Sequence, residues 1–86
     1  MPMNTLKLII EANRNTVLVL FKHRCAVNPA HIATVIHEIE PRSMRPTDWW
    51  ELENMIPLCT SCHGMIHREG TKKWRPKLRS LRESVS

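Results

Sequence analysis

The hydrophobic and polar positions along the chain predict a mixed α+β fold that begins with a helix. Residues 5–22 combine apolar side chains at helical spacing, such as Leu6 and Ile9, with a β-branched run over 16–21. Helix and strand compete in this segment because each periodicity is partly satisfied. We favour a helix that ends near Lys22.

A strand and a polar loop are expected next. Residues 28–30, Asn-Pro-Ala, are a turn signal, and residues 33–40 form a run rich in β-branched side chains. Pro41 closes this run because proline cannot donate a ladder hydrogen bond. Residues 42–50 are mostly polar and contain a further proline and two Trp, which predicts a loop.

A second strand and a helix complete the pattern. Residues 55–58 are a short apolar run and a candidate strand. Thr60 and Ser61 are good N-cap residues, so a helix is expected to run from there to Arg68 and to stop at Gly70. The coarse order is helix, strand, loop, strand, helix.

The length of the chain limits how much a hydrophobic core can stabilise it. A domain of 86 residues buries only about 60% of the surface that its unfolded chain exposes. The apolar side chains are mostly aliphatic, with three Trp, one Phe and no Tyr. A bound metal is therefore expected to add stability.

The positive charge lies at one end of the sequence. Residues 1–67 carry six basic and six acidic residues, whereas residues 68–86 carry seven basic and two acidic ones, which accounts for the whole formal charge of +5. Such a segment attracts polyanions because neutralising phosphates releases counterions. Nucleic acid is thus a plausible partner, and a solvated, partly disordered tail is the alternative.

Three cysteines, Cys25, Cys59 and Cys62, suggest a zinc site. They cannot all pair within one chain, and the Cys-x-x-Cys spacing of the last two suits thiolate ligation of tetrahedral Zn²⁺. A histidine is the expected fourth ligand, and we prefer His31 to His23, because one residue between His23 and Cys25 leaves little room for both to reach one ion.

Two histidines provide a second candidate metal site. His63 and His67 lie four residues apart on the predicted helix, so both imidazoles project from one face and can bind the same ion. The Cys-x-x-Cys motif of Cys59 and Cys62 directly precedes the two histidines, which strengthens the interpretation of the pair as metal ligands.

Together these motifs resemble the HNH nuclease family, in particular its small phage-type members. The resembling stretch runs from Cys25 to about Gly70, roughly half of the chain. It contains a His-bearing strand that ends at proline, an Asn that opens the second strand, and a Cys-x-x-Cys-His-x-x-x-His helix. These features correspond to Cys25, residues 35–43, residues 53–59, Cys62, His63 and His67.

The resemblance implies a ββα-metal (His-Me finger) core with an adjacent zinc-knuckle site. It divides the chain into an N-terminal helical segment (1–24), a nuclease core (25–70) and a basic C-terminal tail (71–86). The implied activity is metal-dependent endonucleolytic hydrolysis of phosphodiester bonds in DNA. The phage-type likeness also implies a role in packaging or processing a phage genome, with terminase or other packaging proteins as partners.

The resemblance also implies roles for individual residues. His63 and His67 would be ligands of the catalytic ion, which could be Mg²⁺, Mn²⁺, Ni²⁺ or Zn²⁺ because histidine ligation is permissive. Asn54 would orient the first strand and the catalytic base by hydrogen bonds. A base from the His37 and Glu38 pair would activate water.

One departure from the family pattern leaves two assignments open. The usual pair before the proline is Asp-His or His-His, a ligand followed by the base, whereas this chain has His37 and Glu38. Register makes His37 the ligand and Glu38 the base. Chemistry favours His37 as the base, since an imidazole with a pKa of about 6.5 suits neutral pH better than a carboxylate near 4.3. We slightly favour the second assignment, with Glu38 or Glu40 completing the metal shell.

The remaining expectations concern partners and surroundings. A non-catalytic zinc module that binds nucleic acid is the main alternative, but a purely structural site has no use for Asn54. The cysteine usage and the lack of a long apolar run or cleavage signal lead us to expect a soluble, cytoplasmic protein without membrane contact. The residues expected to contact DNA are Arg42, Arg45, Lys72, Lys73, Arg75 and Lys77.

Overall fold

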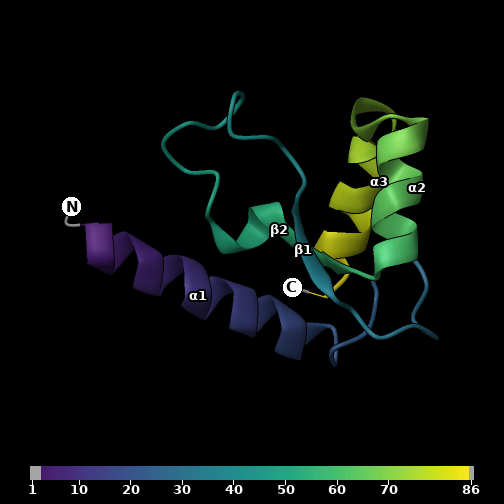
Figure 1. Cartoon of the computed structure of the whole chain (residues 1–86), viewed down its shortest axis with the longest axis horizontal. Helices are drawn as coiled ribbons and strands as arrows, with labels where there is room; N and C mark the ends of the chain where they lie inside the picture. The colour runs from purple at the N-terminus through teal and green to yellow at the C-terminus, as the bar shows by residue number, and fades with distance from the viewer. Residues whose placement is uncertain (1–2, 86) are drawn as a thin grey trace.

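The computed structural model describes residues 3–85 and confirms a small α+β arrangement with a two-stranded antiparallel sheet (Figure 1). The expected order of elements is present, with a third helix added at the end. The elements are α1 (Met3–Leu20), β1 (Val35–Glu38), the 3-10 turn η1 (Leu52–Asn54), β2 (Met55–Leu58), α2 (Thr60–Glu69) and α3 (Thr71–Glu83).

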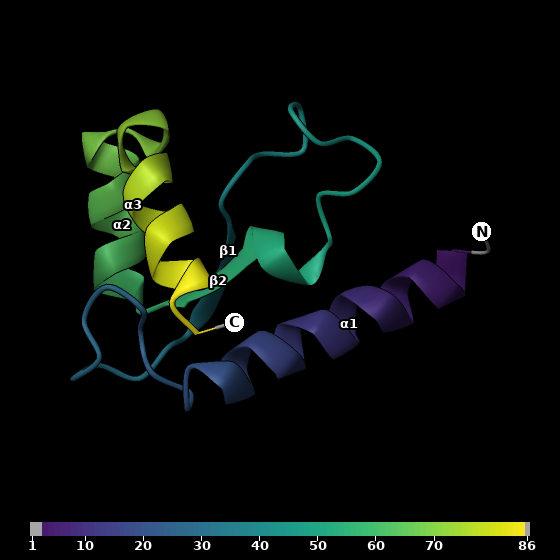
Figure 2. The ribbon, with the colours of Figure 1, turned by 180° about the vertical axis from the view of Figure 1, so that it is seen from behind.

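The first helix is two residues shorter at its end than expected. α1 ends at Leu20 because Lys22 and His23 take left-handed backbone angles, with φ of 55° and 61°. Val17 is its buried anchor, and Asn13 donates a hydrogen bond of 2.8 Å to the carbonyl of Trp50. The other end of α1 extends away from the rest of the protein in both views (Figures 1 and 2). Among the helices of residues 3–85, none combines the length and the apolarity needed to cross a bilayer.

The two strands pair over four residues each, with Val35 opposite Leu58 and Glu38 opposite Met55. The strand expected over 33–40 is therefore shorter than predicted. The residues on either side of β1 still bond to the neighbouring segment of the same chain. The N–H of Thr34 donates to the carbonyl of Leu58 at 2.9 Å, and the N–H of Ile39 donates to that of Asn54 at 2.9 Å. The pairing of the two strands thus places the residues that follow β1 next to Asn54.

Local interactions explain where the helix α2 begins and ends. The Cys59 side chain caps its start by accepting a hydrogen bond from the backbone N–H of Cys62. Gly70 ends it with φ of 112°, an angle that glycine adopts without steric strain, and α3 starts at the next residue. As a result α2 and α3 pack side by side as an antiparallel pair (Figures 1 and 2).

The basic C-terminal segment, 71–86, forms the helix α3 over most of its length and packs against the core. Its buried residue Leu78 is 0% exposed, and Trp74 and Leu81 pack against the same core. These three lie at helical spacing, so α3 buries an apolar stripe while many of its basic side chains face solvent. The charge of the segment hid this stripe in the sequence. The fully buried aliphatic side chains of the core are Ile39, Ile56, Leu58, Ile66 and Leu78.

Candidate metal centres

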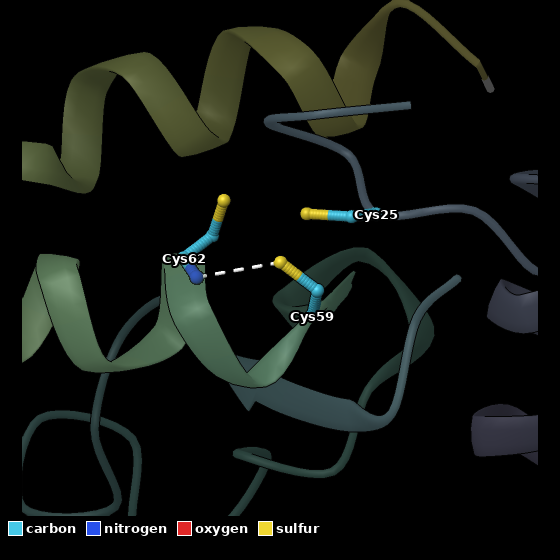
Figure 3. Close-up of side chains that lie close together, drawn as sticks. All are labelled: Cys25, Cys59 and Cys62. Carbon is cyan, nitrogen blue, oxygen red and sulfur yellow. Dashed lines mark hydrogen bonds between the residues drawn. The ribbon is translucent and has the colours of Figure 1, made fainter. Parts of the chain in front are cut away.

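The three cysteines converge as the sequence predicts. Cys25 comes from the loop before β1, Cys59 precedes α2, and Cys62 lies in its first turn. All three are buried, and their sulfur atoms lie within 4.8 Å of one another (Figure 3). Three thiols from two distant segments could hold a metal such as zinc.

Backbone N–H groups surround two of these sulfur atoms. Asn28 donates to Cys25 Sγ at 3.4 Å, and Cys62 donates to Cys59 Sγ at 3.3 Å (Figure 3). Such donors stabilise negative charge on sulfur, as the second shell of a thiolate metal site does. Asn28 therefore supports the cluster through its backbone, although its side chain cannot supply a fourth ligand.

A histidine stands next to the thiols. His31 Nδ1 lies 3.4 Å from Cys59 Sγ. The backbone carbonyl of His23, in contrast, accepts a hydrogen bond from the N–H of Ala33. His31 therefore contacts one thiol, although it does not belong to the group in which the three sulfur atoms lie within 4.8 Å of one another. The Cys62 N–H and His31 lower the pKa of Cys59 to about 6, while burial raises the pKa of Cys62. Cys59 is thus the thiol that most readily becomes the thiolate a metal needs.

The second centre joins three imidazoles from β1 and α2. His37, His63 and His67 each offer a ring nitrogen within 4.8 Å of the other two. Their ring centroids lie 5.5 Å apart for His37 and His63, and 5.8 Å apart for His37 and His67. The Nε2 atoms of His63 and His67 are 3.0 Å apart. The predicted pair on α2 therefore gains its third member from the strand.

The ring nitrogens of this group suit metal ligation. His37 is 8% exposed, and its Nε2 atom is buried without a hydrogen-bond partner among residues 3–85. A buried polar atom without a partner calls for an explanation, and a bound ion is one. Burial, with smaller contributions from His63 and His67, lowers the pKa of His37 to about 4, and burial also lowers that of His63. Both rings are held in the neutral form that binds metals.

A cleft of about 320 Å³ opens at the imidazole group. Its lining includes Glu38 and Thr71 besides the three histidines. Neither Glu38 nor Glu40 belongs to the group whose ligand atoms lie together. This geometry favours the register-based assignment of His37 as a ligand over our preference for it as the base.

The carboxylate of Glu38 is held by an arginine. Arg42 donates through Nε and Nη2 to the two carboxylate oxygens at 3.3 and 3.2 Å. The guanidinium carbon also lies 3.7 Å from the centroid of the Trp49 ring. Arg42, expected to contact DNA, thus has an internal partner, although its side chain remains 59% exposed.

Asn54 is buried where the chain leaves β1, and its side chain bonds to residues that follow the strand. It is 0% exposed, and its side chain makes three hydrogen bonds. Oδ1 accepts from the N–H of Glu40 at 2.9 Å, and Nδ2 donates to the carbonyls of Glu40 at 2.9 Å and Trp49 at 3.0 Å. It therefore fixes the chain two residues beyond Glu38 and the loop that carries Trp49.

The other expected DNA contacts lie in two different settings. Lys72, Lys73 and Lys77 are exposed on α3, whereas Arg75 is partly buried. Arg45 is an internal residue, with a side chain 14% exposed that binds Asp48 and Glu53 at 2.9 and 2.7 Å. Its guanidinium thus has partners within the protein, and its contact with DNA stays a prediction.

Arg79 was predicted only as one basic residue of the C-terminal segment, and the structure gives it specific partners. It donates to the carbonyl of Glu53 and to the carboxylate of Glu40, both at 2.7 Å. These contacts tie α3 to both ends of the loop that Asn54 braces. No local sequence signal marks the residue, because its partners lie 26 and 39 positions away.

A scan of protein-family models, a search of curated proteins and a search of solved structures each found no match to this chain. The likeness to HNH nucleases therefore rests on the motif residues themselves.

Proposed function

We propose that this protein is a metal-dependent endonuclease of the HNH type that hydrolyses phosphodiester bonds in DNA. The observation that supports it most is the meeting of His37, His63 and His67 at an open cleft. Catalytic zinc-type sites use three protein ligands and leave further positions open, whereas structural sites are closed by four. Three imidazoles at a cleft match the first kind.

Within this proposal the three histidines would hold one divalent ion. The ion would act as a Lewis acid on the phosphate and stabilise the charge of the leaving oxygen. His37 supplies a buried nitrogen without another partner, and the four-residue spacing of His63 and His67 on α2 aims both rings at the same point. The rigid hairpin and α2 thus preorganise the ligand set.

Glu38 is then the best-placed general base. It follows His37 directly and lines the same cleft, so it would accept a proton from the attacking water. Arg42 fixes its carboxylate by the two-pronged ion pair, and Asn54 fixes the backbone that follows it. This arrangement gives both Asn54 and Arg42 a positioning role and leaves His37 free to bind metal.

The thiol group has a different task in this proposal. Cys25, Cys59, Cys62 and His31 would hold a structural zinc ion, which supplies the stability that so small a core lacks. DNA is the proposed substrate because the surplus charge of +5 comes from residues 68–86, most of which form α3 beside the cleft.

Nicking of supercoiled plasmid tests the activity. The full-length protein should nick plasmid with added Mn²⁺, Mg²⁺, Ni²⁺ or Zn²⁺, and the His67→Ala variant should lose the activity while keeping its thiol-bound zinc. His23→Ala is the matched control, because His23 belongs to neither group. Absence of nicking with every metal by a folded protein contradicts the proposal.

A non-catalytic, zinc-stabilised nucleic-acid-binding module is the second candidate. The thiol group with His31 beside it favours this function, since it is complete without the imidazoles. One zinc per chain, DNA binding without nicking, and metal content unchanged by His67→Ala would establish it instead.

A further inference from the structure

A second cavity adjoins the imidazole cleft. It measures about 250 Å³ and is lined by Ile39, Glu40, Arg75, Pro76 and Arg79. Ile39 forms a wall of both cavities. Thr71 of the first cavity and Arg75 of the second are one helical turn apart, so they lie on one face of α3. The two cavities therefore lie next to each other along α3.

The cavity carries more positive than negative charge. Its one carboxylate, Glu40, is bound by Arg79 at 2.7 Å and approached by Arg45 at 3.8 Å. The Arg75 side chain makes no ion pair or hydrogen bond among residues 3–85, and its Nε atom is buried. Because a buried donor without an acceptor destabilises a protein, this guanidinium is suited to an anion from outside.

We propose that Arg75 binds a backbone phosphate of the strand that enters the imidazole cleft. The four steps along the helix from Thr71 to Arg75 advance about 6 Å along α3. The bound phosphate would therefore belong to a nucleotide close to the phosphodiester at the histidines. This inference rests on the proposed function, because it takes the cleft to hold a phosphodiester.

Arg75 differs in this respect from the lysines of α3. Lys72, Lys73 and Lys77 are exposed and act on a polyanion through diffuse charge. Arg75 offers a planar fork held partly inside a groove, which suits a specific hydrogen-bonded contact with phosphate oxygens. Such a contact fixes the position of the strand and reads no base.

Binding of a fluorescein-labelled DNA duplex, followed by anisotropy without added divalent ions, tests the site independently of cleavage. Arg75→Ala should weaken binding about tenfold to a hundredfold and reduce the slope of log K against log salt by about 0.9. Arg75→Lys should keep the slope and bind less tightly than the wild type. Arg24→Ala, which removes an equal charge outside both cavities, is the control.

Cleavage of two substrates locates the contact. Bis(p-nitrophenyl) phosphate has one phosphodiester and no neighbouring phosphate. Arg75→Ala should therefore lower kcat/KM for duplex DNA about tenfold and leave that for the small diester unchanged, which also shows that the variant is folded. Equal losses on both substrates overturn the assignment. An Arg75→Ala affinity for the duplex equal to that of Arg24→Ala also overturns the assignment. A wild-type protein that cleaves neither substrate refutes the nuclease proposal, and the binding measurement alone then decides whether Arg75 binds a phosphate.

Discussion

Cys62 and His63 are consecutive residues of α2, and their side chains belong to two different groups. Cys62 faces Cys25 and Cys59, whereas His63 faces His37 and His67. Neighbouring residues on an α-helix are rotated by about 100° from each other, so one turn of α2 can serve both sides. A metal at the thiols would therefore also fix the rotation of the helix that positions His63.

Cys62→Ser should weaken the imidazole site as well as the thiol site. We expect about one zinc fewer per chain and about tenfold weaker Co²⁺ binding at the imidazoles, which is the usual effect of losing an outer support of a metal site. Sulfur-to-cobalt charge transfer distinguishes the thiol site spectroscopically from the imidazole site. Ser61→Ala, one residue earlier and exposed, is the control. Unchanged imidazole affinity in a zinc-depleted Cys62→Ser protein would show that the two centres are independent.

Asn54→Ala should destabilise the protein and impair the cleft together. The change leaves the N–H and carbonyl of Glu40 and the carbonyl of Trp49 without their partner, at a cost of about 3 kcal/mol in the free energy of unfolding. Asn28→Ala is the matched control, because its side chain makes one exposed hydrogen bond to Ala30. Urea unfolding compares the two variants, and equal losses would show that Asn54 has no special bracing role.

The sequence predicted those parts of the site that local spacing specifies. His63, His67, Cys59 and Cys62 lie within one helix and its cap, so their relation follows from helical geometry. The third imidazole was harder to assign because the role of His37 depends on which face of β1 meets α2, a tertiary fact.

The ion pairs of the two glutamates, one local and one long-range, were not predicted from the sequence. Glu38 and Glu40 looked like equivalent candidates for the metal shell, but arginines at positions 42 and 79 bind them. Likewise the charge of residues 71–86 suggested a solvated tail, although the apolar stripe through Leu78 buries one face of α3. The partner of Glu40 lies 39 positions away, and the burial of Leu78 depends on the core that α3 packs against, so neither could be seen from local spacing.

The buried imidazole of His37 predicts a pH dependence of stability. Its pKa is about 4 in the folded protein against about 6.5 in the unfolded chain, so the unfolded state binds more protons between these values. Stability should therefore be complete above pH 6.5 and fall as the pH drops towards 4, by about 1–2 kcal/mol after allowance for solvent screening.

Thermal unfolding at several pH values checks this dependence in protein loaded with one equivalent of Zn²⁺, which the softer thiolates bind first. Protonation of the cysteines also destabilises the protein at low pH. The difference between wild type and His37→Gln isolates the imidazole contribution. Parallel curves for the two proteins would contradict the assignment of the low pKa to His37.

Arg45 and Lys73 should separate stability from DNA binding. Arg45 is nearly enclosed and holds Asp48 and Glu53, so Arg45→Ala leaves two carboxylates without their shared cation and should lower the free energy of unfolding by about 1 kcal/mol. Lys73 is exposed on α3, and Lys73→Ala should leave stability unchanged but reduce duplex affinity and its salt dependence. Urea unfolding measures the stability of both variants, and anisotropy titrations measure their affinity for duplex DNA. A folded Arg45→Ala protein that lost as much DNA affinity as Lys73→Ala would refute the internal role of Arg45. The guanidinium would then have to leave its carboxylates to reach DNA.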